Sequence, residues 1–186
     1  MIGECMRELT EHRAYAMLES RFRRVELDYV ILSCGEAKGG PEMHRQGVEE
    51  AFRILNRRFG GDGFCADFHP ERMAAAQIGV EELLAPPPAD YDAQKKRRVR
   101  CDTPPVPLPY WYAFLSPPHG TPYGSADFVA FHEVLFPHRD NLEIYRWNDG
   151  FSDYFDAGKE WWGTGLWSLL DRTAGVLVVI GASLTD

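Results

Sequence analysis

The segment from Trp147 to Trp162 holds the densest set of side chains in this sequence that could bind or react. It combines four carboxylates with six aromatic rings in sixteen residues. Aromatic rings supply contact area at low entropic cost, and carboxylates complement Lys and Arg. We therefore predict a non-catalytic binding surface for a basic protein, formed by Trp147, Asp149, Asp153, Asp156, Trp161 and Trp162.

The same residues allow other interpretations. Carboxylates can bind a hard cation, or act as acid and base in a glycosidase-like site with tryptophan as a sugar platform. His119 lies in a Pro/Gly loop, where functional residues are common, and could serve as a general base. The alternative function is a small hydrolase with catalytic candidates His119, Asp149 and Asp153. In the simplest interpretation the aromatic rings belong to the core, and the acidic side chains are the solvent-exposed residues of a loop.

A weaker metal-binding candidate lies in residues 64–68, which alternate like a strand. Alternation would place Cys65, Asp67 and His69 on one face, where they could share an ion. Polar residues on the solvent face of an edge strand give the same pattern. The four cysteines form no C-x-x-C pair, and the chain has no P-loop, no G-x-S-x-G and no H-E-x-x-H. We predict no cofactor.

Charge narrows the classes of partner. The net charge is −8, and residues 101–186 hold 4 Lys and Arg against 11 Asp and Glu. Nucleic-acid binding depends on cationic side chains, so this half is a poor candidate for it. The basic run 95–100 resembles a nucleic-acid patch, but it lies between proline clusters without interleaved aromatics. No apolar run approaches the ~20 residues of a membrane span. Scattered cysteines and the absence of a leader pattern predict a cytoplasmic protein. The oligomeric state is not predictable.

The elements that position these residues begin with two helices. An apolar stripe predicts a helix over 9–32. Over 25–33, however, apolar residues also occur at every second position, as they would in a strand. A second helix begins at Pro41 and ends before Gly60. Another should begin at Pro70 and finish with a turn over 80–84.

The second half is predicted to be mixed. Strands are expected at 110–115 and 142–147, and a helix begins at Ser125. Residues 163–170 and 176–183 should form a hairpin. Residues 176–180 are apolar throughout, so they should form a central strand that is covered on both faces.

The predicted fold class is therefore α+β, with a helical N-terminal half packed against a small, mainly antiparallel sheet from the C-terminal half. The predicted organisation is a mainly helical segment over 1–84, a Pro-rich basic linker over 85–109 and an α+β segment over 110–186. A single domain over 1–186 is the alternative.

Overall fold

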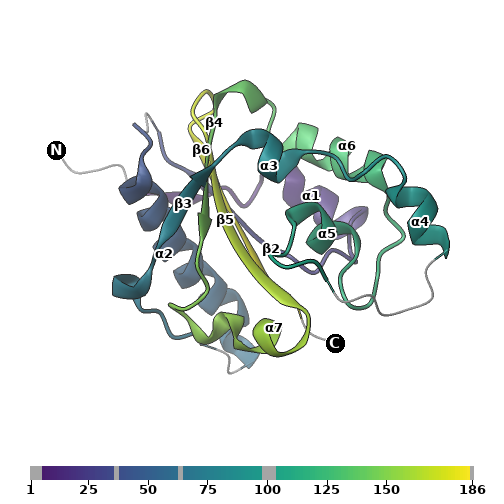
Figure 1. The fold of residues 1–186 in the computed structure, drawn as a ribbon. Coiled ribbons are helices and arrows are strands. Elements are labelled where there is room, and N and C mark those ends of the chain that lie inside the picture. Colours follow the sequence, from purple (N-terminus) through teal and green to yellow (C-terminus); the bar gives the residue numbers. More distant parts are fainter. Residues whose placement is uncertain (1–5, 36–37, 63–64, 98–103, 185–186) are drawn as a thin grey trace.

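One six-stranded antiparallel sheet forms the centre of the molecule (Figure 1). A computed structural model describes residues 6–35, 38–62, 65–97 and 104–184. The sheet has the order β1-β2-β6-β5-β4-β3. The strands are β1 (Arg7–Glu8), β2 (Asp28–Ser33), β3 (Ala75–Ile78), β4 (Leu142–Trp147), β5 (Gly163–Asp171) and β6 (Val176–Leu184). With helices on both faces, the structure confirms the α+β class.

Helix α2 (Pro41–Phe59) packs against one face of the sheet (Figure 1). Pro41 lies in its first turn, where no hydrogen bond needs the missing N–H. The side chains of Val48, Phe52 and Leu55 are buried because residues three and four apart share one side of a helix. The helix predicted to begin at Pro41 is confirmed.

The larger core lies on the opposite face of the sheet, where several helices pack (Figure 1). The rings of Phe22, Phe114 and Phe131 are mutually tilted or edge-on, with centroids 5.3 to 5.7 Å apart. Such geometries suit the quadrupoles of aromatic rings. The helices of this face are α1 (Arg13–Ser20), α3 (Val80–Leu84), α4 (Tyr91–Arg97), α5 (Tyr110–Leu115) and α6 (Ser125–Leu135).

A chain of buried polar groups crosses this core. The Nδ1 atom of His132 lies 2.5 Å from the Phe128 carbonyl oxygen, which can only accept, so Nδ1 carries the proton. Nε2 then accepts from the Tyr110 hydroxyl at 2.6 Å, and Tyr110 accepts from Tyr29 at 2.7 Å. Burial lowers the pKa of His132 to about 3, so the ring is neutral.

Strands β5 and β6 form the predicted hairpin at the centre of the sheet. Residues 163–171 pair with 176–184, and Gly175 in the turn has a φ of +64°, a region that glycine enters without steric cost. Leu177 belongs to the core under α2, whereas Val178 belongs to the core on the other face. The predicted central strand, covered on both faces, is confirmed.

The predicted division into a helical first half and a sheet-forming second half is only partly correct, because β1, β2 and β3 lie early in the chain. The single helix predicted for 9–32 is wrong, since α1 ends at Ser20 and β2 begins at Asp28. Val30 and Ile31 of β2 are buried in different cores. A strand covered on both faces has a continuous apolar pattern, which resembles a buried helix.

The strand predicted for 110–115 is wrong, because these residues form helix α5. A short apolar run fits either structure, and its period does not decide between them. The Pro109 carbonyl accepts a hydrogen bond from the Ala113 N–H at 3.0 Å, which begins the helix. The helix predicted from Ser125 and the strand predicted for 142–147 are both confirmed.

Two predictions around Pro70 are also wrong. Of the strand expected at 64–68, Phe64 lies outside the described residues and the rest has no regular structure. The helix expected from Pro70 is limited to a short 3-10 turn over 70–72. Residues 75–78 instead form β3, because they pair with β4. The helical turn expected over 80–84 is present as α3.

The Pro-rich stretch 85–109 contains helix α4. Lys95 begins the basic run and is half-buried. Its ammonium donates to the carbonyls of Leu115 (2.6 Å) and Tyr123 (2.7 Å) and to the Thr121 hydroxyl (3.1 Å). The last three residues of the run lie outside the described chain. Strands from both sides of this stretch share the one sheet.

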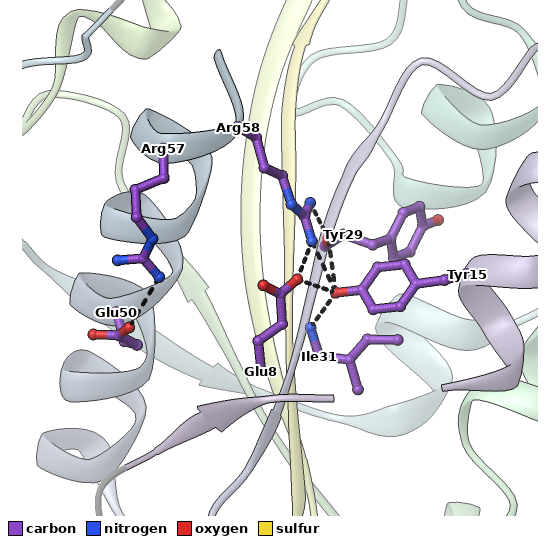
Figure 2. Close-up of polar contacts among 7 residues, drawn as sticks. All are labelled: Glu8, Tyr15, Tyr29, Ile31, Glu50, Arg57 and Arg58. Carbon is purple, nitrogen blue, oxygen red and sulfur yellow. Dashed lines mark hydrogen bonds and ion pairs between the residues drawn. The ribbon is translucent and has the colours of Figure 1, made fainter. Parts of the chain in front are cut away.

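The β1 edge of the sheet is tied down by a group of polar contacts that we call the Arg58 cluster (Figure 2). The guanidinium of Arg58 donates to the Tyr29 carbonyl at 2.9 Å, to the Tyr15 hydroxyl at 3.1 Å and to the Glu8 carboxylate. The Tyr15 oxygen also accepts from the Ile31 N–H at 2.9 Å. The cluster therefore links β1, α1, β2 and the end of α2.

Candidate binding groove

A groove of about 470 Å³ opens beside helix α7 (Asp156–Trp161), near one end of the sheet. Residues 104–108 form one wall, and the ends of β4 and β5 together with α7 form the other. We call it the Trp161 groove; its lining is residues 104–108, 146–149, 159, 161–165 and 167. Four of the six predicted binding residues line it: Trp147, Asp149, Trp161 and Trp162.

Helix α7 holds Trp161 at the groove because it packs closely on the central hairpin. The Gly158 N–H donates to Ser183 Oγ of β6 at 3.2 Å. A Cβ on Gly158 would lie 2.7 Å from the Gly163 carbonyl oxygen and 2.9 Å from Ser183 Cα. Only glycine allows such a close approach of two backbones. The central strands therefore position Trp161.

The three predicted tryptophans have different environments. Trp147 is buried, and its indole N–H donates to Ser168 Oγ at 2.8 Å, so it belongs to the core. Trp162 stacks on Tyr112 with ring centroids 6.4 Å apart. The side chain of Trp161 is 66% exposed. Of the three, Trp161 offers the free ring face that a partner could contact.

The opposite wall contributes an exposed residue that the sequence analysis missed. Val106 is 93% exposed, and it lines the same groove as Trp161. These two are the exposed large hydrophobic side chains among the residues that the structure describes. A valine between prolines was a usable signal, because prolines keep a segment out of helix and sheet interiors.

Two indole N–H groups in the groove lack an acceptor. The Nε1 atoms of Trp162 and Trp167 are buried and have no hydrogen-bond partner within the described chain. An unpaired buried donor costs about 1–3 kcal/mol. Because both Nε1 atoms are buried, a partner in the groove contacts the rings of these residues and not their N–H groups.

The candidate aspartates do not converge on one point. Each has its own partner: Thr164 Oγ1 at 2.6 Å from Asp149, the Asp67 N–H at 2.7 Å from Asp153, and Lys159 Nζ at 3.3 Å from Asp156. The first of these aspartates lines the groove, and the other two are exposed beside it. With Glu160, which is also exposed, they give this end of the molecule an acidic surface.

His119 lies elsewhere in the molecule. It is near Glu26, where burial raises the pKa of that carboxyl and the charges of His119 and Arg24 oppose the shift. No hydrogen bond or ion pair of the described ranges joins His119 to Asp149 or Asp153. The arrangement therefore gives no support to the hydrolase site.

The weak metal candidate is not assembled either. Cys65 is exposed, the Asp67 N–H bonds to Asp153, and His69 Nδ1 lies 3.5 Å from Glu71 Oε1. Since residues 65–69 are not a strand, alternation does not align them. Among the residues with described positions, no group of three His, Cys, Asp or Glu side chains could hold a metal ion.

A serine, a histidine and a glutamate converge in the core under α2, which no local pattern reveals. His44 Nδ1 lies 2.8 Å from Ser168 Oγ across a sequence separation of 124 residues. Ser168 Oγ accepts from Trp147, so its own proton is directed to His44. Nε2–H of His44 then faces Glu143 Oε1 at 3.6 Å.

This triad is structural rather than catalytic. Ser168 and His44 have no exposed surface, so no substrate reaches the hydroxyl. Burial lowers the pKa of His44 to about 4 although Glu143 opposes the shift. Glu143 is itself held by Arg172 and by the Gly40 N–H at 2.6 Å. The triad ties the start of α2 to β4 and β5.

Comparisons with protein-family models, with curated proteins and with solved structures find no match for this chain. Within the described ranges, no helix has both the length and the apolar surface needed to cross a bilayer.

Proposed function

We propose that this chain is a protein-binding module whose Trp161 groove receives an extended, basic segment of a partner. The observation that carries the proposal is the pairing of Trp161 and Val106, two exposed apolar side chains on one groove. Exposed apolar surface that is gathered at a concave site, rather than scattered, marks interaction sites.

The charge around the groove supports a basic partner. The segment 147–162 carries four carboxylates and one lysine, and the lysine is already paired with Asp156. Arg146, the other cation of the lining, is paired with Glu82 at 2.9 Å. The unpaired charge beside the groove is therefore negative, which steers Lys and Arg side chains toward it.

Trp161 is the expected centre of the binding energy. Tryptophan is enriched among the residues whose truncation weakens interfaces most, and acidic residues around it act mainly on association rate and specificity.

The thiols are consistent with action in a reducing, cytoplasmic compartment. Cys34 and Cys65 are free, and burial raises the pKa of the Cys34 thiol to about 11. A thiol with a raised pKa is weakly nucleophilic.

The experiment that tests this function compares variants in parallel. The wild-type chain and the variants are each immobilised on a resin. The resin is then incubated with lysate of the source organism at low and at high salt. Each captured protein is then purified and titrated directly. Trp161→Ala should weaken binding about 30-fold, and the double variant Asp156→Asn/Glu160→Gln should weaken it several-fold at low salt only.

The matched control is the double variant Glu133→Gln/Asp140→Asn, which removes two exposed charges away from the groove. It should bind as the wild type does. The proposal fails if no basic protein is retained, or if every retained protein binds the Trp161→Ala variant with unchanged affinity.

A further inference from the structure

The two edges of the sheet differ in how they are protected. Strand β1 has two charged residues, and the Arg58 cluster holds Glu8 (Figure 2). Strand β3 has neither charge nor proline, and its first three residues, 75–77, are exposed. Residues 73–80 contain no charged side chain at all. Natural sheets usually protect an edge with charges, prolines or a covering segment, so β3 is an open edge.

The register identifies which backbone groups of β3 are open. The Asn148 N–H donates to the Ala74 carbonyl at 2.9 Å, so Ala74 belongs to a hydrogen-bonded pair with β4. Hydrogen-bonded pairs alternate along an antiparallel ladder, so Ala76 also turns its N–H and C=O toward β4. Ala75 and Gln77 therefore turn theirs outward. No described residue forms a hydrogen bond with these four outward groups.

We propose that β3 pairs with β3 of a second copy of this chain, antiparallel, about a two-fold axis at Ala76. Ala75 of one copy then lies opposite Gln77 of the other, and the four outward groups of each copy form four N–H···O bonds. Ala76 meets its own counterpart at a non-hydrogen-bonded position, where Cα atoms approach to about 4.5 Å. The small methyl groups of alanine fit this distance. The two six-stranded sheets become one continuous sheet.

A second copy suits this edge better than another occupant does. The donors and acceptors are symmetric about Ala76, which is what a two-fold interface requires. Residues 73–80 carry no charge that would attract a charged peptide or repel a second copy within the strand. The edge is only four residues long, so the interface falls below the standard size of a stable complex and the dimer is weak. Two chains of net charge −8 repel each other, so added salt strengthens the dimer.

The inference is tested by sedimentation velocity on the full chain over roughly 5 to 500 µM, a range that brackets weak contacts. The dimer fraction should rise with protein concentration and with salt. Residue-resolved amide exchange gives a second measurement. Protection of the Ala75 and Gln77 amides should increase with concentration, while the Ala76 amide, which bonds to β4, should be protected throughout.

Variants separate this edge from other surfaces. Gln77→Pro removes an outward N–H without removing a bond to β4, and it should abolish the dimer, while Gln77→Ala should retain it. Ala76→Lys places like charges opposite each other and should weaken the dimer about tenfold. Gln77→Pro and Ala76→Lys should both keep the wild-type circular dichroism spectrum. A chain that stays monomeric throughout the range, or a dimer that survives both changes, overturns the inference. Trp161→Ala should leave dimerisation unchanged.

Discussion

Arg57 and Arg58 are consecutive residues of helix α2, but only Arg58 contacts the sheet (Figure 2). The side chain of Arg57 is 66% exposed, with a single carboxylate 3.7 Å away on its own helix. The side chain of Arg58 is 35% exposed and bonds to the carbonyl oxygen of Tyr29. Two arginines that look equivalent in the sequence therefore differ in what they stabilise.

We expect Arg58→Ala to lower the free energy of unfolding by about 2 kcal/mol, because it removes the guanidinium that donates to the Glu8 carboxylate, the Tyr29 carbonyl and the Tyr15 hydroxyl. Arg57→Ala is the matched control and should cost less than about 0.5 kcal/mol, as exposed ion pairs contribute little. Urea unfolding at neutral pH measures both. Equal effects of the two variants would show that the Arg58 cluster does not stabilise the fold.

Stability should fall as the pH is lowered from about 6.5 to about 3. The pKa of His44 is lowered to about 4 and that of His132 to about 3, in both cases chiefly by burial. The unfolded chain takes up protons near pH 6.5 and the folded chain does not, so acid favours unfolding. At about 1.4 kcal/mol per unit, His44 alone accounts for a loss on the order of 3 kcal/mol.

Thermal unfolding at stepped pH values measures this loss, and the imidazole NMR signals of His44 should not titrate above pH 5. In the His44→Gln variant, the pH dependence should be shallower even if the variant is less stable at pH 7. An unchanged slope would show that His44 is not the group that resists protonation.

Lys95 should matter for folding although it begins a basic run. Lys95→Met removes the ammonium that donates to two carbonyl oxygens and a hydroxyl, so we expect a loss of about 2 kcal/mol. Lys96→Met changes an exposed neighbour and should have little effect. Chemical denaturation compares the two. Similar curves would contradict the role that we assign to the half-buried ammonium of Lys95.

Gly158→Ala should loosen α7, because the new Cβ meets backbone atoms of Gly163 and Ser183, which have little freedom to move. We expect a loss of about 2–3 kcal/mol and a shifted fluorescence of the tryptophans in the groove. Gly61→Ala, with nothing within 4 Å of its Cβ, is the control. A Gly158→Ala chain of wild-type stability would show that this contact can relax.

The elements that were predicted correctly have a regular spacing of apolar residues and residues that mark both of their ends. Helix α2 begins at a proline and ends at a glycine pair, and the hairpin of β5 and β6 surrounds a tight turn. Residues 110–115 lack a period, because every position except Trp111 is buried. Residues 75–78 are exposed and weakly patterned, and only the pairing with β4 makes them a strand.

The candidate site was predictable only in part. The acidic aromatic segment was identified, but the sequence does not show that Trp147 is core whereas Trp161 is exposed. That difference depends on strand direction and on the packing of α7. The wall at 104–108 and the convergence of His44 with Ser168 depend on contacts between distant segments, which composition and spacing do not encode.

The strand order has a consequence for synthesis of the chain. Strand β2 pairs with β6, and β3 pairs with β4. Neither of these pairings can form until residues 142–184 have been synthesised. While the ribosome is still making that region, α2 can form, but the sheet face that it covers is absent. Long-range pairing of this kind slows folding and exposes apolar surface meanwhile. We expect nascent chains released before β5 to aggregate or be degraded rather than fold.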